Sequence, residues 1–223
     1  NGPNREIYEI TLDDAFNMSG GTLTNTLDVS SEDNIPTDIS FNDDGSKLFV
    51  NGFQGNTVIV YPLDTDYSLA ASSVGTPAEF DLPSQTPKNK DIIFNNDGTK
   101  MYISSADSSN DHISVYSVPT AFDLSAGFSH LGNFSVQSQN AQPWGIKFND
   151  DGTKLFMVGF LNEQYVYEYS LNTAFELIAA DPTLTSSVPA DNATGVAVDA
   201  NIVLNFSENV NVESGNITIK KTS

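Results

Sequence analysis

The stretch Asp38–Val50, which reads D-I-S-F-N-D-D-G-S-K-L-F-V, decides the fold of this chain. It recurs 53 residues later as D-I-I-F-N-N-D-G-T-K-M-Y-I in Asp91–Ile103. A third copy, G-I-K-F-N-D-D-G-T-K-L-F-M, follows 54 residues after that in Gly145–Met157. A repeat of this length, built from short apolar segments and glycine turns, is typical of β-propeller blades. We therefore expect an all-β protein.

Each copy predicts a β-hairpin. Ile39 and Phe41 alternate with polar residues, which places them on one face of a first strand. The turn Asn42–Gly45 follows, because Asn and Asp tolerate turn dihedrals and glycine takes the positive φ. The second strand, Leu48–Val50, is apolar on both faces. We expect neighbouring sheets to cover both faces of such a strand.

A third and a fourth strand complete each unit. Third strands are predicted at Ile7–Leu12, Val58–Leu63, Ile113–Val118 and Val166–Leu171. Fourth strands are predicted to end in Leu27/Val29, Phe80/Leu82 and Phe134/Val136. The predicted fold is thus a partial β-propeller of about three and a half four-stranded blades, whereas closed rings typically have four to eight. We expect another chain, for example in a homo-oligomer that completes the ring, or residues upstream of Asn1 to supply the remainder.

The repeat pattern ends near residue 180, and a different pattern begins at Pro182. There, Ile202, Leu204 and Phe206 alternate as inward-facing strand residues would, and Ile217 and Ile219 repeat that spacing. We therefore predict two domains, propeller repeats in 1–180 and the beginning of a second module with strands in 181–223.

The repeat resembles a known group of propellers. F-N-D-D-G-T-K-L-F in Phe148–Phe156, followed by V-Y-E-Y-S-L-N-T-A-F-E-L in Val166–Leu177, resembles the propeller repeats of surface and phage-associated proteins of marine bacteria. It is similar, more distantly, to the Pro-Asp-Gly repeats of TolB-like and lactonase-like propellers. Asp43, Asn96 and Asp150 stand where proline is usual in those repeats. The resemblance implies a propeller fold and leaves the activity open.

The C-terminal segment resembles the start of bacterial Ig-like domains. The matching positions are Pro189, Ala190, Thr194-Gly195-Val196, Ile202, Leu204, Phe206 and Ser207. Asn192 stands where glycine is usual, and asparagine also accepts left-handed turn geometry. An Ig-like sandwich needs about 100 residues, so we expect a truncated sandwich. The resemblance implies a spacer module of a secreted or cell-surface bacterial protein.

Charge and composition exclude several partners. The chain has 29 acidic and 9 basic residues, a net charge of −20, which repels nucleic acid and anionic membranes. It has no cysteine, and therefore neither disulfides nor thiolate metal sites. No apolar run approaches the ~20 residues that a membrane span needs. We expect a secreted or cell-surface protein that binds no nucleic acid and inserts into no membrane.

No spacing in the sequence indicates catalysis or a cofactor. The two histidines, His112 and His130, belong to no H-x-x-H or H-E-x-x-H pattern, and we predict no catalytic residue and no metal site. The D-D-G turns end in lysine and lack the distal glutamate of a calcium loop. Asp107–Asp111 is a longer acidic loop, interpreted as an insertion, with a weak calcium contact as the alternative.

The loops at one end of the blades form the candidate binding face. Trp144, the only tryptophan, falls there, where it could stack on a sugar or a protein, or pack against the adjacent blade. Asp38 and Asp91 begin first strands and are predicted to approach the axis or to hydrogen-bond a neighbouring loop, while Gly145 replaces them in the third copy. His112 is interpreted as a solvated residue opening a third strand. The candidate binding residues are Asp38, Asn89, Asp91, His112 and Trp144.

These observations favour a non-catalytic binding or adhesion scaffold that presents propeller loops to a protein or glycan. The alternative is an enzyme, a lactonase-like or glycan-cleaving propeller with part of its site outside this sequence. A third hypothesis is a purely structural spacer whose loop face binds nothing.

Overall fold

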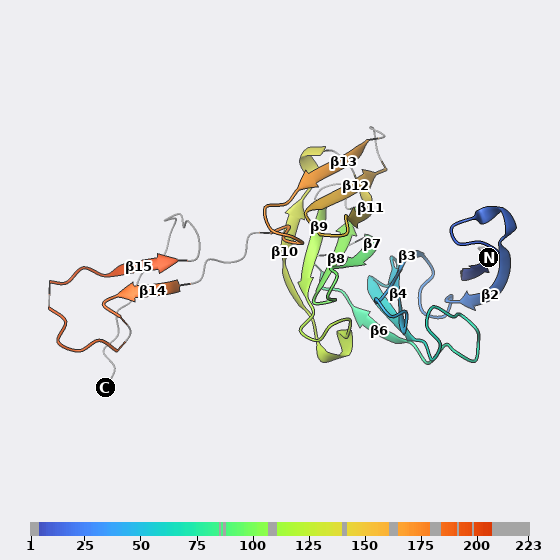
Figure 1. Cartoon of the computed structure of the whole chain (residues 1–223), viewed down its shortest axis with the longest axis horizontal. Coiled ribbons are helices and arrows are strands. Elements are labelled where there is room, and N and C mark those ends of the chain that lie inside the picture. Colours follow the sequence, from blue (N-terminus) through green and yellow to red (C-terminus); the bar gives the residue numbers. More distant parts are fainter. Residues whose placement is uncertain are drawn as a thin grey trace. The chain divides into compact units, whose positions relative to one another are not determined.

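The computed structural model divides the chain into two compact units, Asn1–Ile178 and Ala179–Ser223 (Figure 1). The described residues are 5–84, 86, 88–106, 111–139, 142–160, 165–178, 184–190, 192–197 and 199–206. Each unit is described by itself below.

Within the described residues, unit 1 is built from four antiparallel sheets that follow one another along the chain (Figure 1). The first sheet pairs β1 (Glu6–Thr11) with β2 (Thr22–Asp28). The second has the order β3 (Pro36–Phe41), β4 (Lys47–Gly52), β5 (Thr57–Pro62), β6 (Ala78–Asp81). The third has the order β7 (Asn89–Phe94), β8 (Lys100–Ser105), β9 (His112–Ser117), β10 (Ser129–Ser135). The fourth contains β11 (Pro143–Phe148), β12 (Lys154–Gly159) and β13 (Val166–Ser170).

This arrangement confirms the expected all-β fold class. Within the described residues the antiparallel sheets do not close into a ring, which fits a partial propeller. The second and third sheets each pair four sequential strands, and the first and fourth have two and three strands, as the repeat predicts. Three short 3₁₀ turns, η1 (Met18–Gly20), η2 (Leu124–Ala126) and η3 (Gln137–Gln139), are the helical elements among the described residues. No helix in this part of the chain is long and apolar enough to cross a membrane.

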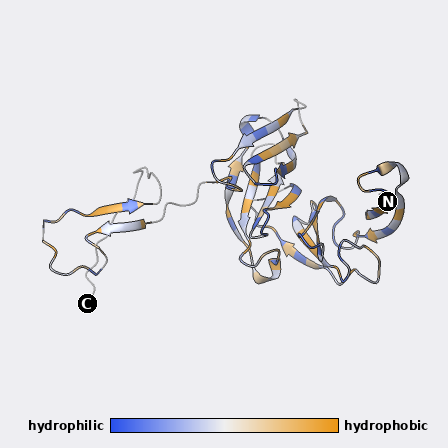
Figure 2. Cartoon of the chain, in the orientation of Figure 1, coloured by the Kyte–Doolittle hydropathy of each residue, from blue (hydrophilic) through white to orange (hydrophobic). Residues whose placement is uncertain are grey.

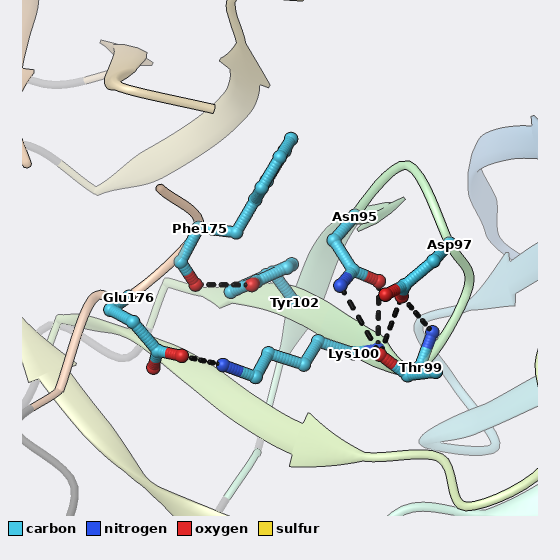
Figure 3. Close-up of polar contacts among 7 residues, drawn as sticks. All are labelled: Asn95, Asp97, Thr99, Lys100, Tyr102, Phe175 and Glu176. Carbon is cyan, nitrogen blue, oxygen red and sulfur yellow. Dashed lines mark hydrogen bonds and ion pairs between the residues drawn. The ribbon is translucent and has the colours of Figure 1, made fainter. Parts of the chain in front are cut away.

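The Asn-x-Asp-Gly turn is held by the same bonds in each sheet that has one. In the third sheet the Lys100 N–H donates to Asn95 Oδ1 at 2.8 Å, and the Thr99 N–H donates to Asp97 Oδ1 at 2.9 Å (Figure 3). Gly98 has φ +68°, a conformation that glycine adopts without strain. Because these side chains satisfy the backbone of the turn, the local sequence is sufficient to specify the hairpin.

An aromatic residue from later in the same repeat covers each turn glycine. Tyr67, Phe122 and Phe175 adopt positive φ angles of 58°, 53° and 60°, and their N–H groups donate to the carbonyls of Gly45, Gly98 and Gly152. A Cβ placed on Gly98 would lie 2.2 Å from the Phe122 ring. The glycine is therefore required both for its dihedral angle and for the close approach of the ring.

Alternate residues of the second strands enter successive cores, which explains why these strands are apolar on both faces. In β4, Leu48 and Val50 join a core with the first sheet, whereas Phe49 joins a core with the third. In β8, Met101 and Ile103 face the second sheet and Tyr102 faces the fourth. All six side chains are fully buried, and hydrophobic residues lie along the strands in Figure 2. Consecutive sheets thus stack face to face.

The second strand of the fourth sheet differs from that expectation. Leu155 and Met157 are buried against the third sheet, but Phe156 is only half-buried and Val158 is 44% exposed. Within the described residues no further sheet covers the second face of β12. The prediction that neighbouring sheets cover both faces is wrong for this strand. Its sequence matches β4 and β8, but among the described residues a neighbouring sheet lies only on one of its faces.

Between the third and fourth sheets, polar contacts supplement the apolar core. The Tyr102 hydroxyl donates to the Phe175 carbonyl at 2.6 Å, and Lys100 forms an ion pair with Glu176 (Figure 3). Phe175 and Glu176 both belong to the turn that covers Gly152 in the fourth sheet's hairpin. The turn therefore fixes the hairpin of its own sheet and contacts the sheet before it.

Unit 2 contains one two-stranded sheet within the described residues, β14 (Leu184–Val188) paired antiparallel with β15 (Val203–Phe206). Asn192 has φ 61°, as expected for an asparagine at a usual glycine position. Ile202 and Phe206 are 54% and 36% exposed, so the predicted inward burial is not seen in a sheet of two strands. Ser207, Ile217 and Ile219 lie outside the described residues.

Candidate functional site

The first and second strands of the sheets place equivalent residues at one end of unit 1. The residue after the second strand donates its N–H to the carbonyl that precedes the first strand, as Phe53 does to Ile35 at 3.0 Å and Phe160 to Gln142 at 3.0 Å. Ala106 makes the same bond in the third sheet. These positions therefore recur in space as well as in sequence.

Four side chains from three successive sheets form one cluster at this end. Trp144 in β11 stacks on Phe160, with ring centroids 4.5 Å apart and planes 16° from parallel. Lys90 in β7 places Nζ 3.8 Å from the Phe53 ring centroid and 4.7 Å from that of Trp144. We call Phe53, Lys90, Trp144 and Phe160 the aromatic–lysine row. Trp144 is 44% and Phe160 62% exposed, so the row offers aromatic surface to a ligand.

The lysine of the row is only partly solvated. Burial and then the charge of Lys88 lower the pKa of Lys90 below its usual range. Contact with two aromatic rings favours the ammonium form through cation–π attraction. The row therefore combines flat apolar surface with one positive charge.

Asp38 and Asp91 connect neighbouring sheets. Asp38 Oδ2 accepts the Ile92 N–H at 3.0 Å, and Asp91 Oδ2 accepts the Ile146 N–H at 2.5 Å. Both amides belong to the first strand of the next sheet, and not to a neighbouring loop as the sequence suggested. Gly145 occupies the equivalent position in the fourth sheet.

The two carboxyl groups also contact each other. Burial, and then the hydrogen bond and charge of Asp38, raise the pKa of Asp91 to about 8. Two carboxylates in such proximity share a proton, because both cannot ionise without strong repulsion. The pair is therefore a proton-sharing link between the second and third sheets.

Asn89 and His112 are buried, and the interpretation of His112 as a solvated loop residue is wrong. His112 is 1% exposed as the first residue of β9, where it pairs in register with Ser105 and Ser135. Asn89 donates to Asn51 Oδ1 at 2.7 Å from a fully buried position. The polar interior of the third sheet accommodates both residues, so neither side chain offers surface to a ligand.

Among the predicted residues, Trp144 alone belongs to the aromatic–lysine row. It lies in strand β11 and not in a loop, and it meets the adjacent sheet through Lys90. Sequence analysis did not single out Phe53, Lys90 or Phe160. The recurring pair Gly52-Phe53 and Gly159-Phe160 was a usable signal, because it falls at the same step of two repeats.

A metal site finds no support in the described part of the chain, where no group of three or more His, Asp or Glu side chains converges. The acidic loop considered for calcium is not described over residues 107–110, and Asp111 beside it is buried.

Comparisons with known proteins support the C-terminal resemblance. Residues 179–223 match the model of a bacterial Ig-like domain. This confirms that the second unit is similar to the Ig-like modules found in bacterial surface proteins. No curated protein matches the chain.

Solved structures that are similar to this chain include three with low sequence identity. A protein described as a 6-phosphogluconolactonase from Bacteroides uniformis is 12% identical, with a TM-score of 0.47, and the match covers 70% of this chain and 46% of that one. Hsv2 of Kluyveromyces lactis is 17% identical, with a TM-score of 0.36, and the match covers 65% of this chain and 38% of Hsv2. KlAtg21, in complex with the coiled coil of AgAtg16, is 18% identical, with a TM-score of 0.43, and the match covers 68% of this chain and 44% of that one. The chain spans less than half of each of these proteins. Likeness at this level indicates nothing about activity, and the Ig-like module of residues 179–223 is what the comparisons establish.

Proposed function

We propose that this protein is a non-catalytic binding scaffold of a secreted or cell-surface bacterial protein, which presents the loop end of its propeller blades to a protein or glycan. The observation that carries the proposal is the aromatic–lysine row, in which Trp144 and Phe160 are 44% and 62% exposed although they stack on each other. Exposed aromatic surface on a rigid sheet is suited to recognition.

The Ig-like match of residues 179–223 supports the surface-associated part of the proposal. The repeat itself is assigned, as part of the same proposal, to propellers of the Pro-Asp-Gly type found in bacterial surface and phage-associated proteins. A sheet-built platform joined to a spacer module suits attachment, because the spacer separates the binding face from the cell.

The polar groups near the row favour binding over catalysis. Asp38 and Asp91 each accept a backbone N–H and also share a proton, so both carboxyl groups serve the junction between sheets. His112 is buried, and His130 contacts Asn133 Oδ1 at 2.8 Å.

The test is a glycan array and a pull-down with the full 223-residue chain and with Trp144→Ala. We expect a ligand whose binding weakens at least about tenfold in Trp144→Ala, as for a central aromatic contact. Tyr8→Ala is the matched control, because Tyr8 is 56% exposed on the first sheet. Turnover of a lactone or glycan without stable binding would instead support an enzyme and overturn the proposal.

We also propose that a second copy of the chain contributes to a closed ring. The exposed face of β12 and the exposed residues of the first sheet, such as Ile10 and Leu23, are apolar surfaces that a further sheet would bury. Solution mass measured over a range of protein concentrations tests this. A dimer supports it, and a monomer at all concentrations contradicts it.

A further inference from the structure

We propose that the aromatic–lysine row is a subsite for an anionic sugar, a saccharide residue that carries a carboxylate or sulfate group. The inference rests on the proposed binding function and adds the chemical class of the ligand. In this arrangement the sugar ring packs on the aromatic surface that the stacked Trp144–Phe160 pair leaves exposed, while Lys90 pairs with the acidic substituent.

The row is not a packing device of the repeat. Packing devices recur in every complete sheet, as the aromatic residues over Gly45, Gly98 and Gly152 do. The row occurs once, because the position of Lys90 and Trp144 is taken by Thr37 in the second sheet, and the position of Phe53 and Phe160 by Ala106 in the third. Features that break a repeat at exposed positions are candidates for function rather than for folding.

The aromatic pair leaves apolar surface on which a sugar ring can pack. Trp144 and Phe160 cover each other's facing sides, with planes 16° from parallel, and the two residues still remain 44% and 62% exposed. Aromatic side chains offer a rigid apolar face together with a polar edge, which suits the C–H face of a pyranose whose hydroxyl groups stay in water. An apolar protein partner would instead favour a well-packed pocket that excludes water.

Lys90 supplies the charge selectivity. Among the described residues its ammonium group contacts two rings and no carboxylate, whereas Lys100 and Lys154 pair with Glu176 and Glu168. Lys47 donates to the Phe122 carbonyl instead, whereas Lys90 contacts aromatic rings. Burial and Lys88 destabilise its charged form, and a bound anion would offset that cost.

The net charge of −20 does not prevent this interaction. Charges are screened over about 8 Å at physiological ionic strength, so the groups next to the row dominate the local potential. Of these, Lys88 and Lys90 are positive, and the Asp38–Asp91 pair holds a shared proton that reduces its negative charge. The nearby Asp33 carboxylate is buried and accepts the N–H groups of Gln54 and Gly55.

The experiment measures binding of the 223-residue chain to four probes: oligogalacturonate, its methyl ester, dextran sulfate and dextran. We expect at least one charged probe to bind at least about tenfold more tightly than its neutral counterpart, as a charge-assisted contact allows. The oligogalacturonate pair tests carboxylate and the dextran pair tests sulfate, so the two arms distinguish the acidic group.

Three variants connect that preference to the row. Lys90→Met should abolish the preference for the charged probe, and Lys90→Arg should retain most of it. Phe160→Ala should weaken charged and neutral probes alike, and it should fold because Phe160 is 62% exposed. Lys154→Met is the control for loss of charge, because Lys154 pairs with Glu168. Thermal melts of each variant identify any that fail to fold.

Several outcomes overturn the inference. Equal binding of charged and neutral probes, or an unchanged preference in Lys90→Met, would refute the anionic class, while a loss of binding in Trp144→Ala would leave the proposed function standing. Binding of a purified protein partner at Trp144 without binding of any saccharide would refute the sugar and keep the scaffold. Turnover of a substrate that is insensitive to Trp144→Ala would refute both.

Discussion

Phe16 and Phe122 occupy the same step of the repeat, but their surroundings differ completely. Both residues have positive φ angles, 61° and 53°. Each lies within a turn closed by a backbone hydrogen bond, which the Asn17 N–H donates to the Asp14 carbonyl and the Asp123 N–H donates to the Thr120 carbonyl. Phe122 covers Gly98 and lies 5.3 Å from the Phe94 ring, whereas Phe16 is 98% exposed. The turn is therefore specified locally, while burial of its ring requires the Asn-x-Asp-Gly hairpin.

The largest effect is expected at the covered glycine. Gly98→Ala introduces a Cβ at φ +68° and 2.2 Å from the Phe122 ring, and it should lower the free energy of unfolding by about 4 kcal/mol, from backbone strain plus overpacking. Chemical denaturation measures this. The control is the same change made in a Phe122→Ala background, which keeps the backbone strain at Gly98 and removes the ring. Equal losses in the two backgrounds would show that the ring contact contributes nothing.

The two phenylalanines themselves provide the next test. Phe122→Ala should cost about 3 kcal/mol of stability because it removes a packed ring, and Phe16→Ala should cost less than about 0.5 kcal/mol. Both changes are made at the same backbone conformation, so the strain at positive φ cancels from the comparison. A large loss in Phe16→Ala would mean that another molecule covers that ring in solution.

The junction between the second and third sheets should depend on pH. The folded-state pKa of Asp91, about 8, lies above its unfolded value, so the folded protein holds a proton that the unfolded chain has released. Stability from this group is complete below about pH 4 and is lost as pH rises to about 8, with a slope of up to about 1.4 kcal/mol per pH unit. Denaturation from pH 5 to 9 measures it. Asp91→Asn should remove that slope, and an unchanged slope in this variant would refute the shared proton.

Among the contacts between sheets, a small effect is expected at the ion pair between the third and fourth sheets. The Lys100 and Glu176 side chains are 22% and 37% exposed, so Lys100→Met should cost only about 0.5–1 kcal/mol, with a loss that shrinks in high salt. Melting curves at two salt concentrations measure this. A salt-independent loss would mean that Lys100 acts through packing of its aliphatic chain instead.

The sheets could be predicted from the sequence because their determinants are local. Alternating Ile39 and Phe41, the Asn42–Gly45 turn and the doubly apolar Leu48–Val50 fix a hairpin within 13 residues, and the spacing of the copies then gives the order of the sheets. The exposure of one face of β12 could not be predicted in this way. Val158 is 44% exposed, although the corresponding strands β4 and β8 of the other repeats are buried.

The candidate site was harder to predict because it is assembled from three sheets. Trp144 stands out as the only tryptophan, but Lys90, Phe53 and Phe160 acquire meaning only when the strand ends are brought together. His112 was placed in solvent because histidine next to a loop is commonly hydrated. The third sheet instead has a polar interior, in which Ser104, Ser105 and Ser114 are also buried.

The edges of the sheets have a practical consequence. Among the described residues, β1 pairs only with β2 and β13 only with β12, so each leaves one row of backbone groups available for cross-strand hydrogen bonding. Glu6 and Glu9 lie on β1, and Glu168 lies on β13 where it pairs with Lys154, so at neutral pH the net negative charge of the chain opposes unspecific association at these edges. Near the isoelectric point of about 4.1 that net charge vanishes. Acidification is therefore expected to convert dispersed protein into fibrous or amorphous precipitate.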